Sequence, residues 1–499
     1  MKYIGLDIGT SVAKAVVFDE EGRIISCANK GYDFIFPDRG LIELDPEDIW
    51  RAVKLVLKEA SIKAGREDIR ACAISSFGEA FVPISRNGNV LRKSIVATDS
   101  RGETELDVIL SKIQRNELMK ITGLPPSTNY SLSKILWIKN NEPEIYGEVW
   151  KFLLIQDFIC FKLCGEAVTD PSSASRTMAF NVEEKKWSQK ILDTVGIDKD
   201  LFSKVISSGT PIGRISKKIA AELGLPKSLI LAMGGHDQPC AALGAGVIND
   251  GMALISTGST EGITLILPKM LLKDNIEESN FPCEPFVING VYNTLAYNHT
   301  AGFLLKWFIE TFTSKVPEEA RDTKVFKYFD SMCPEPPTRI FILPHFSGSA
   351  TPHMDASSKG AIIGLNLATS KYEIYKAFLE GMTYELAYNL EFLDRFGVQI
   401  NDMRTAGGGA NSMVWLQIKA DILNKEITTL ECNEAAALGA SILAAKACGD
   451  FNSIEYAVES IIRIKDTFYP DEAKVRTYAK KLDTYKKIYW ILKEINANI

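Results

Sequence analysis

The chain has 499 residues, which exceeds the size of a single hydrophobic core, so we expect two domains of about 200 to 250 residues with a cleft between them. Hydrophobic residues make up 46% of the chain and charged residues 24%, which is ordinary for a globular protein and excludes a disordered or fibrous chain. The formal net charge of −6 provides no basic surface, so nucleic acid and anionic membranes are not expected as partners.

Cysteine and histidine usage bears on the cellular compartment and on metal binding. Nine cysteines are scattered along the chain without a Cys-x-x-Cys pair, which favours a reduced, cytoplasmic environment. The four histidines show no ligand spacing for zinc, so we expect no zinc site. We also expect neither a signal peptide nor a membrane span, because no apolar run approaches the roughly 20 residues that cross a bilayer.

The first elements of the chain are predicted to be a strand (residues 3–7), a turn of Gly, Thr and Ser (9–11) and a second strand (13–18). Such a turn offers N–H and hydroxyl groups to phosphate oxygens. Asp7 lies just before it, where a carboxylate either caps the turn or holds Mg²⁺ through water beside the phosphates. Lys14 points either into the same region or into solvent, and the sequence leaves both open.

Two helices and two buried strands are predicted in the following part of the chain. Asp45, which precedes a proline, is the N-cap of one helix, and residues 151–163 form the other. Each strand ends in polar side chains: Glu79 after the first strand, and Asp99 with Arg101 after the second. Ligands of α/β proteins bind at strand ends, so these side chains are candidates to grip sugar hydroxyls. A surface ion pair among them is the alternative.

The stretch 228–262 combines two pieces of chemistry. An apolar run (229–233) predicts a buried strand that stops at a pair of glycines, so Asp237 lies at a strand tip, where a carboxylate can take a proton from an alcohol. A strand, a turn of Thr, Gly, Ser and Thr (257–260) and another strand follow. A surface Asp and a glycine-eased turn are the alternative for either piece alone. Together the two pieces indicate phosphoryl transfer to a hydroxyl.

The last part of the chain adds a long helix and a glycine-rich turn. Ser370 begins a capping box, and the helix that it opens is predicted to run to about residue 396. Three glycines (407–409) separate a strand from a helix, so a flat ring can lie against the backbone near the amides of the helix N-terminus. Adenine or its ribose is the candidate ligand, and a close crossing of helix and strand is the alternative.

The strand–turn–strand units around Gly9 and Gly258 lie about half a chain length apart. They predict two halves built on one plan, with two hydroxyl-rich turns that face each other across a cleft where the phosphates of a nucleotide lie. The sequence contains no GxxxxGK[ST] motif and no GxGxxG motif after the first strand, which excludes a P-loop enzyme and argues against a Rossmann dinucleotide site.

Taken in order, these motifs resemble the FGGY family of carbohydrate kinases. The resemblance runs nearly end to end and implies an α/β fold of the two-lobed, actin-like (ribonuclease H-like) ATPase type, with duplicated mixed sheets flanked by helices. It is carried by GLDIGTSVAKAVVFD (5–19), LIELDPEDIW (41–50), LLIQDFICFKLCGE (153–166), GGHDQPCAALGAG (234–246), PHFSGSATPHMD (344–355), LEGMTYEL (379–386), AGGGANSMVWLQIKADIL (406–423) and EAAALGASILAA (434–445).

The resemblance also implies roles for individual residues. Asp237 matches the catalytic base, which deprotonates the hydroxyl that attacks the γ-phosphate of ATP, and Asp7 matches the Mg²⁺ site. The implied nucleotide-binding residues are Thr10, Ser11, Gly258, Ser259, Gly302, Gly409, Ala410 and Asn411. The implied substrate-binding residues are Gly78, Glu79, Asp99, Arg101 and Gln238.

Two departures from the family pattern concern the substrate. Glycerol kinases carry Gln-Arg-Glu and xylulokinases carry Gln-Met-His where this chain has Phe77, Gly78 and Glu79. Both often carry a Trp where this chain has Ala97. Loss of that Trp predicts room for a larger or differently branched substrate.

We therefore expect a kinase that uses ATP and Mg²⁺ to phosphorylate a hydroxyl of a sugar, sugar acid or polyol. Residues 1–246 are predicted to form the lobe that binds sugar and phosphate, 247–447 the nucleotide-binding lobe and 448–499 a helical extension. The alternative function is a non-catalytic or chaperone-like actin-fold ATPase that switches shape for a protein partner. A small-molecule substrate is the expected partner, and the sequence leaves a homodimer open.

Overall fold

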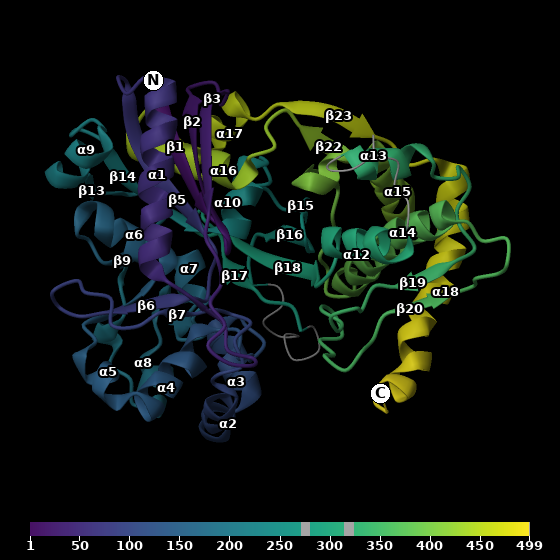
Figure 1. Ribbon diagram of the computed structural model, residues 1–499, viewed down its shortest axis with the longest axis horizontal. Helices are drawn as coiled ribbons and strands as arrows, with labels where there is room; N and C mark the ends of the chain where they lie inside the picture. The colour runs from purple at the N-terminus through teal and green to yellow at the C-terminus, as the bar shows by residue number, and fades with distance from the viewer. Residues whose placement is uncertain (271–279, 314–323, 499) are drawn as a thin grey trace.

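The computed structural model describes residues 1–270, 280–313 and 324–498. Its strands form two large mixed sheets, one in each half of the chain (Figure 1). The first sheet contains, in spatial order, β13 (Pro211–Arg214), β14 (Ile230–His236), β5 (Ile69–Ser76), β1 (Lys2–Ile8), β2 (Val12–Asp19) and β3 (Ile24–Gly31). The second contains β17 (Glu284–Pro285), β18 (Tyr292–Asn298), β16 (Glu261–Leu267), β15 (Met252–Thr257), β21 (Asp402–Ala406), β22 (Ile427–Leu430) and β23 (Ile464–Phe468).

The two sheets repeat one strand plan. In the first, β1 pairs antiparallel with β2 and parallel with β5, which pairs parallel with β14. In the second, β15 pairs antiparallel with β16 and parallel with β21, which pairs parallel with β22. The duplicated mixed-sheet α/β architecture predicted from the sequence is therefore confirmed.

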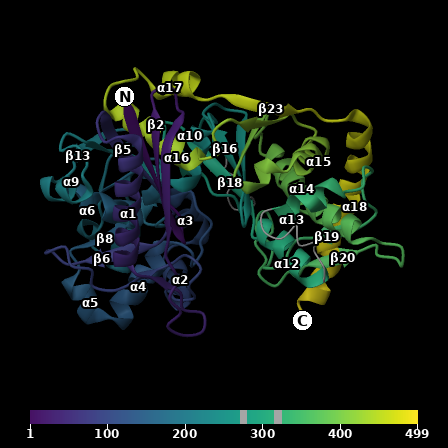
Figure 2. The ribbon, with the colours of Figure 1, turned by 45° about the horizontal axis from the view of Figure 1, so that its top comes forward.

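Helices cover the outer face of each sheet and fill the space between the sheets. The outer face of the first sheet packs against α1 (Pro46–Ala64), α6 (Ile155–Cys164) and α9 (Lys217–Leu223). The outer face of the second packs against α12 (Gly302–Phe312), α14 (Lys371–Asp394) and α15 (Met413–Leu423). Between the sheets lie α10 (Asp237–Gly244) and α16 (Ala435–Ala447), as Figures 1 and 2 show.

The contact between α10 and α16 depends on glycines, because their backbones touch. A Cβ atom added to Gly439 of α16 would lie 1.9 Å from the carbonyl oxygen of Cys240, and one added to Gly244 of α10 would lie 1.9 Å from that of Ala435. On the sheet side, a Cβ on Gly5 of β1 would lie 1.8 Å from the carbonyl oxygen of Ala437. Any larger side chain at these positions would push the two halves apart.

The remaining elements of the first half lie mostly below its large sheet in the view of Figure 1, and we call them the lower region. The others belong to the second half of the chain. The lower region contains β4 (Glu43–Leu44), β6 (Phe81–Ile84), β7 (Ser94–Ile95), α2 (Glu103–Lys112), α3 (Arg115–Thr122), α4 (Ser131–Asn141), α5 (Pro143–Glu148), β8 (Lys151–Leu154), β9 (Val168–Thr169), α7 (Pro171–Ser175), β10 (Phe180–Asn181), β11 (Lys186–Trp187), α8 (Gln189–Val195) and β12 (Lys204–Val205). The second half also contains α13 (Lys324–Ser331), β19 (Phe341–Leu343), β20 (Ala361–Ile363), α17 (Ile454–Ile461) and α18 (Glu472–Asn496).

Some predicted elements differ from the structure. Residues 151–163 are not one helix: β8 pairs antiparallel with β6 before α6 begins, and the apolar character of both segments hides the boundary. Strand β14 does not stop at Gly234 but continues to His236, because a glycine there allows the backbone of β5 to approach. The C-terminal segment is not wholly helical, since β23 completes the second sheet.

The helix starts agree with the predicted caps. The Asp45 carboxylate accepts a hydrogen bond from the backbone N–H of Glu47 at 2.9 Å, and α1 begins at the proline between them. Ser370 and Glu373 form the reciprocal capping box of α14. These local signals therefore place two long helices correctly.

The glycine contact between the halves can be tested with two matched substitutions. Gly439→Ala should lower the free energy of unfolding by about 1–3 kcal/mol, because the new methyl group overlaps the backbone of α10. Gly147→Ala, in the exposed helix α5 with no atom within 4 Å of the added Cβ, should leave stability unchanged or raise it by up to about 1 kcal/mol. Urea denaturation measures both. Equal effects of the two substitutions would contradict the packing argument.

Candidate active site

A cavity of about 520 Å³ lies where the two halves meet. Its walls come from the carboxyl ends of the parallel strands β1, β5 and β14 in the first half and of β15 and β21 in the second. The residues at the N-terminus of α16 also line it. Ligand sites in α/β proteins occupy this end of parallel strands, so the cavity is the candidate site.

Asp237 is the first residue of α10, directly after β14. Its side chain lines the cavity and keeps 28% of its surface exposed. Burial, reinforced by the negative charges of Asp7 and Glu79, raises the pKa of Asp237 to about 7. A carboxyl with this pKa can accept a proton near neutral pH.

His236 lies beside Asp237, with its Nε2 atom 3.2 Å from Asp237 Oδ1. Burial lowers the pKa of His236 well below its ordinary value, so the ring is neutral at pH 7. The backbone N–H of His236 donates to Ser172 Oγ at 3.0 Å, which holds the end of β14 against α7. The histidine therefore shields the carboxylate without adding a positive charge.

Asp7, the penultimate residue of β1, also lines the cavity, and its Oδ1 atom accepts a hydrogen bond from Ser75 Oγ at 2.9 Å. Burial raises its pKa, while Ser75 and Lys14 act in the opposite direction. Lys14 does not point into solvent: it pairs at 2.6 Å with Glu434, a cavity-lining residue of the second half.

A single carboxylate fits Mg²⁺, because this ion keeps several waters and takes phosphate oxygens as further ligands. In the part of the chain that the structure describes, no group of three or more His, Cys, Asp or Glu is arranged to hold a metal ion. Asp7 stays the predicted Mg²⁺ ligand, for an ion bound largely through water and phosphate.

The substrate candidates Gly78, Glu79 and Gln238 all line the cavity. Glu79 has a positive φ of 66°, and its side chain is bound by Arg176, whose Nε atom lies 2.7 Å from Glu79 Oε1. Arg176 also pairs with Glu284, which belongs to β17 in the second half. Sequence reasoning missed Arg176 and Glu284, because only the folded chain brings them to Glu79.

Asp99 and Arg101 are not among the cavity-lining residues. Both are buried, and they pair with each other at 2.6 Å, while Arg101 also pairs with Glu43 at 2.7 Å. The ion pair that the sequence offered as an alternative therefore exists, but it is buried and does not include Glu79. Ala97 does not line the cavity either.

The two predicted phosphate turns lie on opposite walls. Thr10 lines the cavity, and its neighbour Ser11 is exposed in the turn between β1 and β2. In the second turn, Gly258 also lines the cavity. The backbone N–H of Gly302 donates to the carbonyl oxygen of Gly258 at 3.0 Å, and that of Ala301 donates to Ser259, so the N-terminus of α12 rests on the second turn.

The triple glycine packs on the same turn. A Cβ atom on Gly407 would lie 2.6 Å from the carbonyl oxygen of Thr257, and one on Gly409 would lie 2.5 Å from its Cγ2 atom. The close backbone crossing that the sequence allowed is therefore present. Gly409, Ala410 and Asn411 form a short 3₁₀ helix (Gly408–Asn411) beside the cavity-lining Gly407.

A buried ion pair supports the second turn from behind. Lys419 of α15 pairs with Glu261 at 2.8 Å, and neither side chain is exposed to solvent. Lys419 also donates to Thr257 Oγ1 at 3.0 Å, and Thr257 Oγ1 donates to Glu261 Oε1 at 2.8 Å. The Lys419 ammonium lies 4.0 Å from the centre of the Trp415 ring. The turn is thus tied to the helix that follows the triple glycine.

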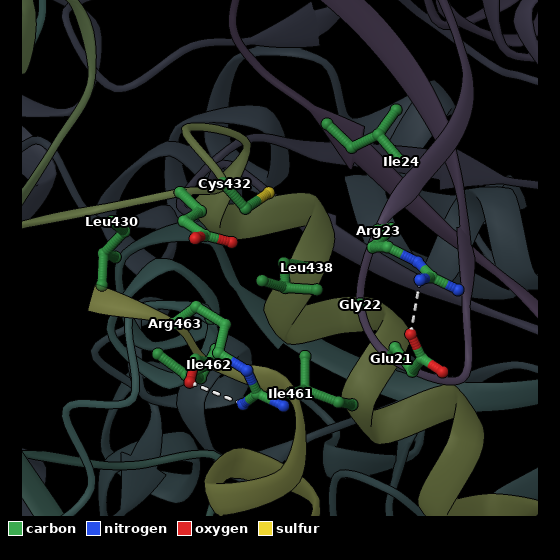
Figure 3. Close-up of a pocket in the computed structure, with 12 residues that line it drawn as sticks. Glu21, Gly22, Arg23, Ile24, Leu430, Cys432, Leu438, Ile461, Ile462 and Arg463 are labelled. Atoms are coloured by element: carbon green, nitrogen blue, oxygen red, sulfur yellow. Dashed lines mark hydrogen bonds and ion pairs between the residues drawn. The ribbon is translucent and has the colours of Figure 1, made fainter. Parts of the chain in front are cut away.

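A second cavity, of about 360 Å³, lies on the far side of the junction between the halves (Figure 3). It is bounded by the turn between β2 and β3 and by the segment between α17 and β23. Its arginines are engaged: Arg23 pairs with Glu21 at 2.6 Å, and Arg463 donates to the carbonyl oxygen of Ile462 at 3.0 Å. Its carboxylates are Glu21, which pairs with Arg23, and Glu431, which directly follows β22. None of the predicted site residues lines this cavity.

Solved structures show which class of protein this architecture defines. A xylulose kinase from Rhodospirillum rubrum superimposes with a TM-score of 0.89 at 23% identity and covers 100% of both chains. A gluconate kinase from Lactobacillus acidophilus has a TM-score of 0.88 at 23% identity and covers 98% of each chain. The fold is therefore that of the two-domain α/β sugar kinases.

The chain belongs to the FGGY family of carbohydrate kinases. The N-terminal domain of the family matches residues 2–244, and its C-terminal domain matches residues 253–448. A xylulose kinase from Bacillus subtilis (strain 168) is 30% identical over 504 residues, covering 100% of this chain and 98% of its own. One from Staphylococcus xylosus is 29% identical, covering 97% of this chain and 99% of its own.

The protein is accordingly a carbohydrate kinase that catalyses ATP-dependent phosphorylation of a sugar, and the chaperone-like switch is not favoured. None of the helices in the described ranges has the length and apolar character that a membrane crossing requires.

The support of the second turn can be tested by removing one partner of the buried pair. Lys419→Met should lower the free energy of unfolding by about 3–5 kcal/mol, because it leaves the Glu261 carboxylate buried without a counter-charge. The double variant Lys419→Met/Glu261→Gln should recover part of this loss. Urea denaturation measures both.

The matched control is Lys54→Met, which removes a partly exposed pair with Glu222 and should change stability by less than about 1 kcal/mol. A loss as small as this in Lys419→Met would show that the buried pair does not support the turn.

Proposed function

We propose that Asp237 is the base that deprotonates the acceptor hydroxyl, with the phosphates of ATP along the two hydroxyl-rich turns and the sugar between Glu79 and Gln238. The observation that carries this proposal is the position of Asp237: a carboxylate with a pKa of about 7, at the end of β14, in the cavity that both turns line. A base is most effective when its pKa lies near the working pH.

The chemical step needs little more than alignment and charge. The acceptor oxygen forms a bond to the γ-phosphorus as its proton passes to the Asp237 carboxylate, and the bond from phosphorus to the β-phosphate oxygen breaks to release ADP. Asp7 would hold Mg²⁺, which would supply positive charge to the phosphate oxygens. The N-termini of α10, α12 and α16 lie at the cavity or on its second turn, where helix ends favour anions.

We assign the phosphates to the backbone N–H and hydroxyl groups of the two turns. Thr10 and Gly258 line the cavity, and Ser11 and Ser259 are their neighbours in the turns. Gly302 donates its N–H to the carbonyl oxygen of Gly258. Gly409, Ala410 and Asn411 are the adenosine side of the proposal, supported by their place in a short 3₁₀ helix directly after the cavity-lining Gly407.

The substrate that we test first is xylulose, for which the Bacillus subtilis and Staphylococcus xylosus relatives are named. The lobe boundaries at residues 246 and 447, a cytoplasmic location and a homodimer stay predictions of the sequence.

Replacing the base should separate binding from chemistry. Asp237→Asn removes the proton acceptor but keeps the shape of the side chain, so ATP binding should be retained while kcat falls by at least about 100-fold. Isothermal titration with ATP and a coupled assay of ADP release measure the two quantities. Asp394→Asn, at an exposed position near the end of α14, is the control and should leave both unchanged. Near-normal turnover in Asp237→Asn would remove the base from the proposal.

The pH dependence of kcat/KM should report the same carboxyl. The raised pKa means that Asp237 is protonated, and inactive as a base, below about pH 7, so kcat/KM should fall about tenfold per pH unit on the acid side and level off above it. Assays with the auxiliary enzymes in excess at every pH provide the profile. A profile that stays flat down to about pH 5 would contradict the assignment, because it would require an ordinary carboxyl pKa.

A further inference from the structure

Arg176 is a charged residue that no sequence motif indicated. It lies at the part of the cavity around Glu79 and Gln238, which we call the sugar end. It directly follows α7, and all three of its guanidinium nitrogens donate to carboxylates. Nε and Nη2 donate to Glu79 Oε1, and Nη1 donates to Glu284 Oε1. The side chains of Arg176 and Glu79 are each 12% exposed and that of Glu284 is 3% exposed, so the three charges are largely withdrawn from water.

Gly78 makes this arrangement possible. A Cβ atom added to Gly78 would lie 2.9 Å from Cγ of Arg176, so the arginine stem occupies the space that a side chain at position 78 would need. The guanidinium also lies 5.1 Å from the centre of the Tyr130 ring, which fixes its plane. Burial lowers the pKa of Arg176, but Glu284 and Glu79 outweigh it and hold the pKa well above its ordinary value.

The charge balance of the cavity is negative. Among the cavity-lining residues that the structure describes, Arg176 is the one cationic side chain, since His236 is neutral. The acidic lining residues are Asp7, Glu79, Asp237, Glu261 and Glu434. Lys14 and Lys419 neutralise Glu434 and Glu261 from outside the cavity. At the sugar end, Glu79 and Glu284 together exceed the charge of Arg176, and Asp237 adds to the excess when it is ionised.

We propose that Arg176, held between Glu79 and Glu284, makes the sugar end select an uncharged polyhydroxylated substrate and reject a sugar acid. A carboxylate on the substrate would meet a guanidinium that is already bound by two carboxylates, and it would stand close to the negative charge of Asp237. Hydroxyl groups meet no such repulsion. Because Glu284 comes from the second half and Glu79 from the first, the same bridge joins the two halves at the sugar end. The inference rests on the proposed function, and it assigns to Arg176 and Glu284 a role in specificity.

The test compares two ligands that differ in charge and hardly in shape. D-xylonate and its neutral amide, D-xylonamide, are assayed for ADP release and for binding by calorimetry, with D-xylulose as the reference sugar. The wild-type protein should favour the amide over the acid by at least about 100-fold in kcat/KM, because like charges that are largely withdrawn from water repel strongly. A wild-type protein that takes xylonate as well as xylonamide would overturn the inference.

Glu284→Gln tests whether the ion pairs of Arg176 with Glu79 and Glu284 cause the preference for the amide. The substitution keeps the side-chain shape but frees Nη1 of Arg176 from a carboxylate, so the ratio of kcat/KM for acid over amide should rise at least about tenfold. A purely structural role of Glu284 would lower both values and leave the ratio unchanged, which would also overturn the inference. Glu284→Asp keeps the charge and should keep the wild-type ratio. Glu222→Gln, at a surface pair with Lys54, is the matched control.

The experiments distinguish a failure of the proposed function from a failure of the role assigned to Arg176. If no sugar supports turnover, the proposed function is overturned, and the dissociation constants of xylonate and xylonamide from calorimetry still decide the inference. If D-xylulose is phosphorylated but xylonate is accepted as well as the amide, the function stands and the role of Arg176 falls.

Discussion

The backbone contact between α10 and α16 is the constraint on which the rest of the structure depends. Glycines at positions 5, 244 and 439 let the two helices and β1 approach until backbone meets backbone, so the two sheets are held on either side of one helix pair. Asp237 begins one of these helices, and the residues around Glu434 begin the other. The packing that joins the halves therefore also sets where Asp237 and the opposite wall of the cavity lie. An interior packed this closely tolerates little change in volume, so the packing of the core determines the geometry of the site.

The second consequence is electrostatic. Both halves direct the carboxyl ends of their parallel strands toward one cavity, and several carboxylates lie there. These carboxylates differ in their partners. Glu261 and Glu434 are neutralised by lysines from neighbouring elements, and Glu79 is bound by Arg176. In the described part of the chain, the one ring or cationic nitrogen paired with Asp237 belongs to His236, which is neutral. Burial and the surrounding negative charge then raise the pKa of Asp237 toward neutrality, whereas a paired carboxylate would be a poor base.

Much of this could be predicted from the sequence, because the signals are local. The caps at Asp45 and Ser370 predict where two helices begin. The two Gly/Thr/Ser turns predict that the two halves share one arrangement of strands. The strand-tip position of Asp237 was also visible, although the strand runs on through two glycines whose close contact with β5 no local pattern shows. Tertiary partners were harder to predict. The sequence left open whether Asp99 and Arg101 bind a ligand or form a surface ion pair, and in the structure they form a buried pair that does not include Glu79. Arg176 and Glu284 lie more than a hundred positions apart and meet only in the folded chain. The helix predicted at 151–163 failed because a short apolar strand and an apolar helix have the same composition.

The central claim is that the carboxylate of Asp237, in the cavity between the lobes, receives the proton of the acceptor hydroxyl. A crystal structure with xylulose and a non-hydrolysable ATP analogue tests it most directly. The account predicts that one sugar hydroxyl lies about 2.6–3.2 Å from the Asp237 carboxylate and in line with the γ-phosphate. A ternary complex in which every sugar hydroxyl bonds elsewhere, with Asp237 facing water or protein, would contradict it.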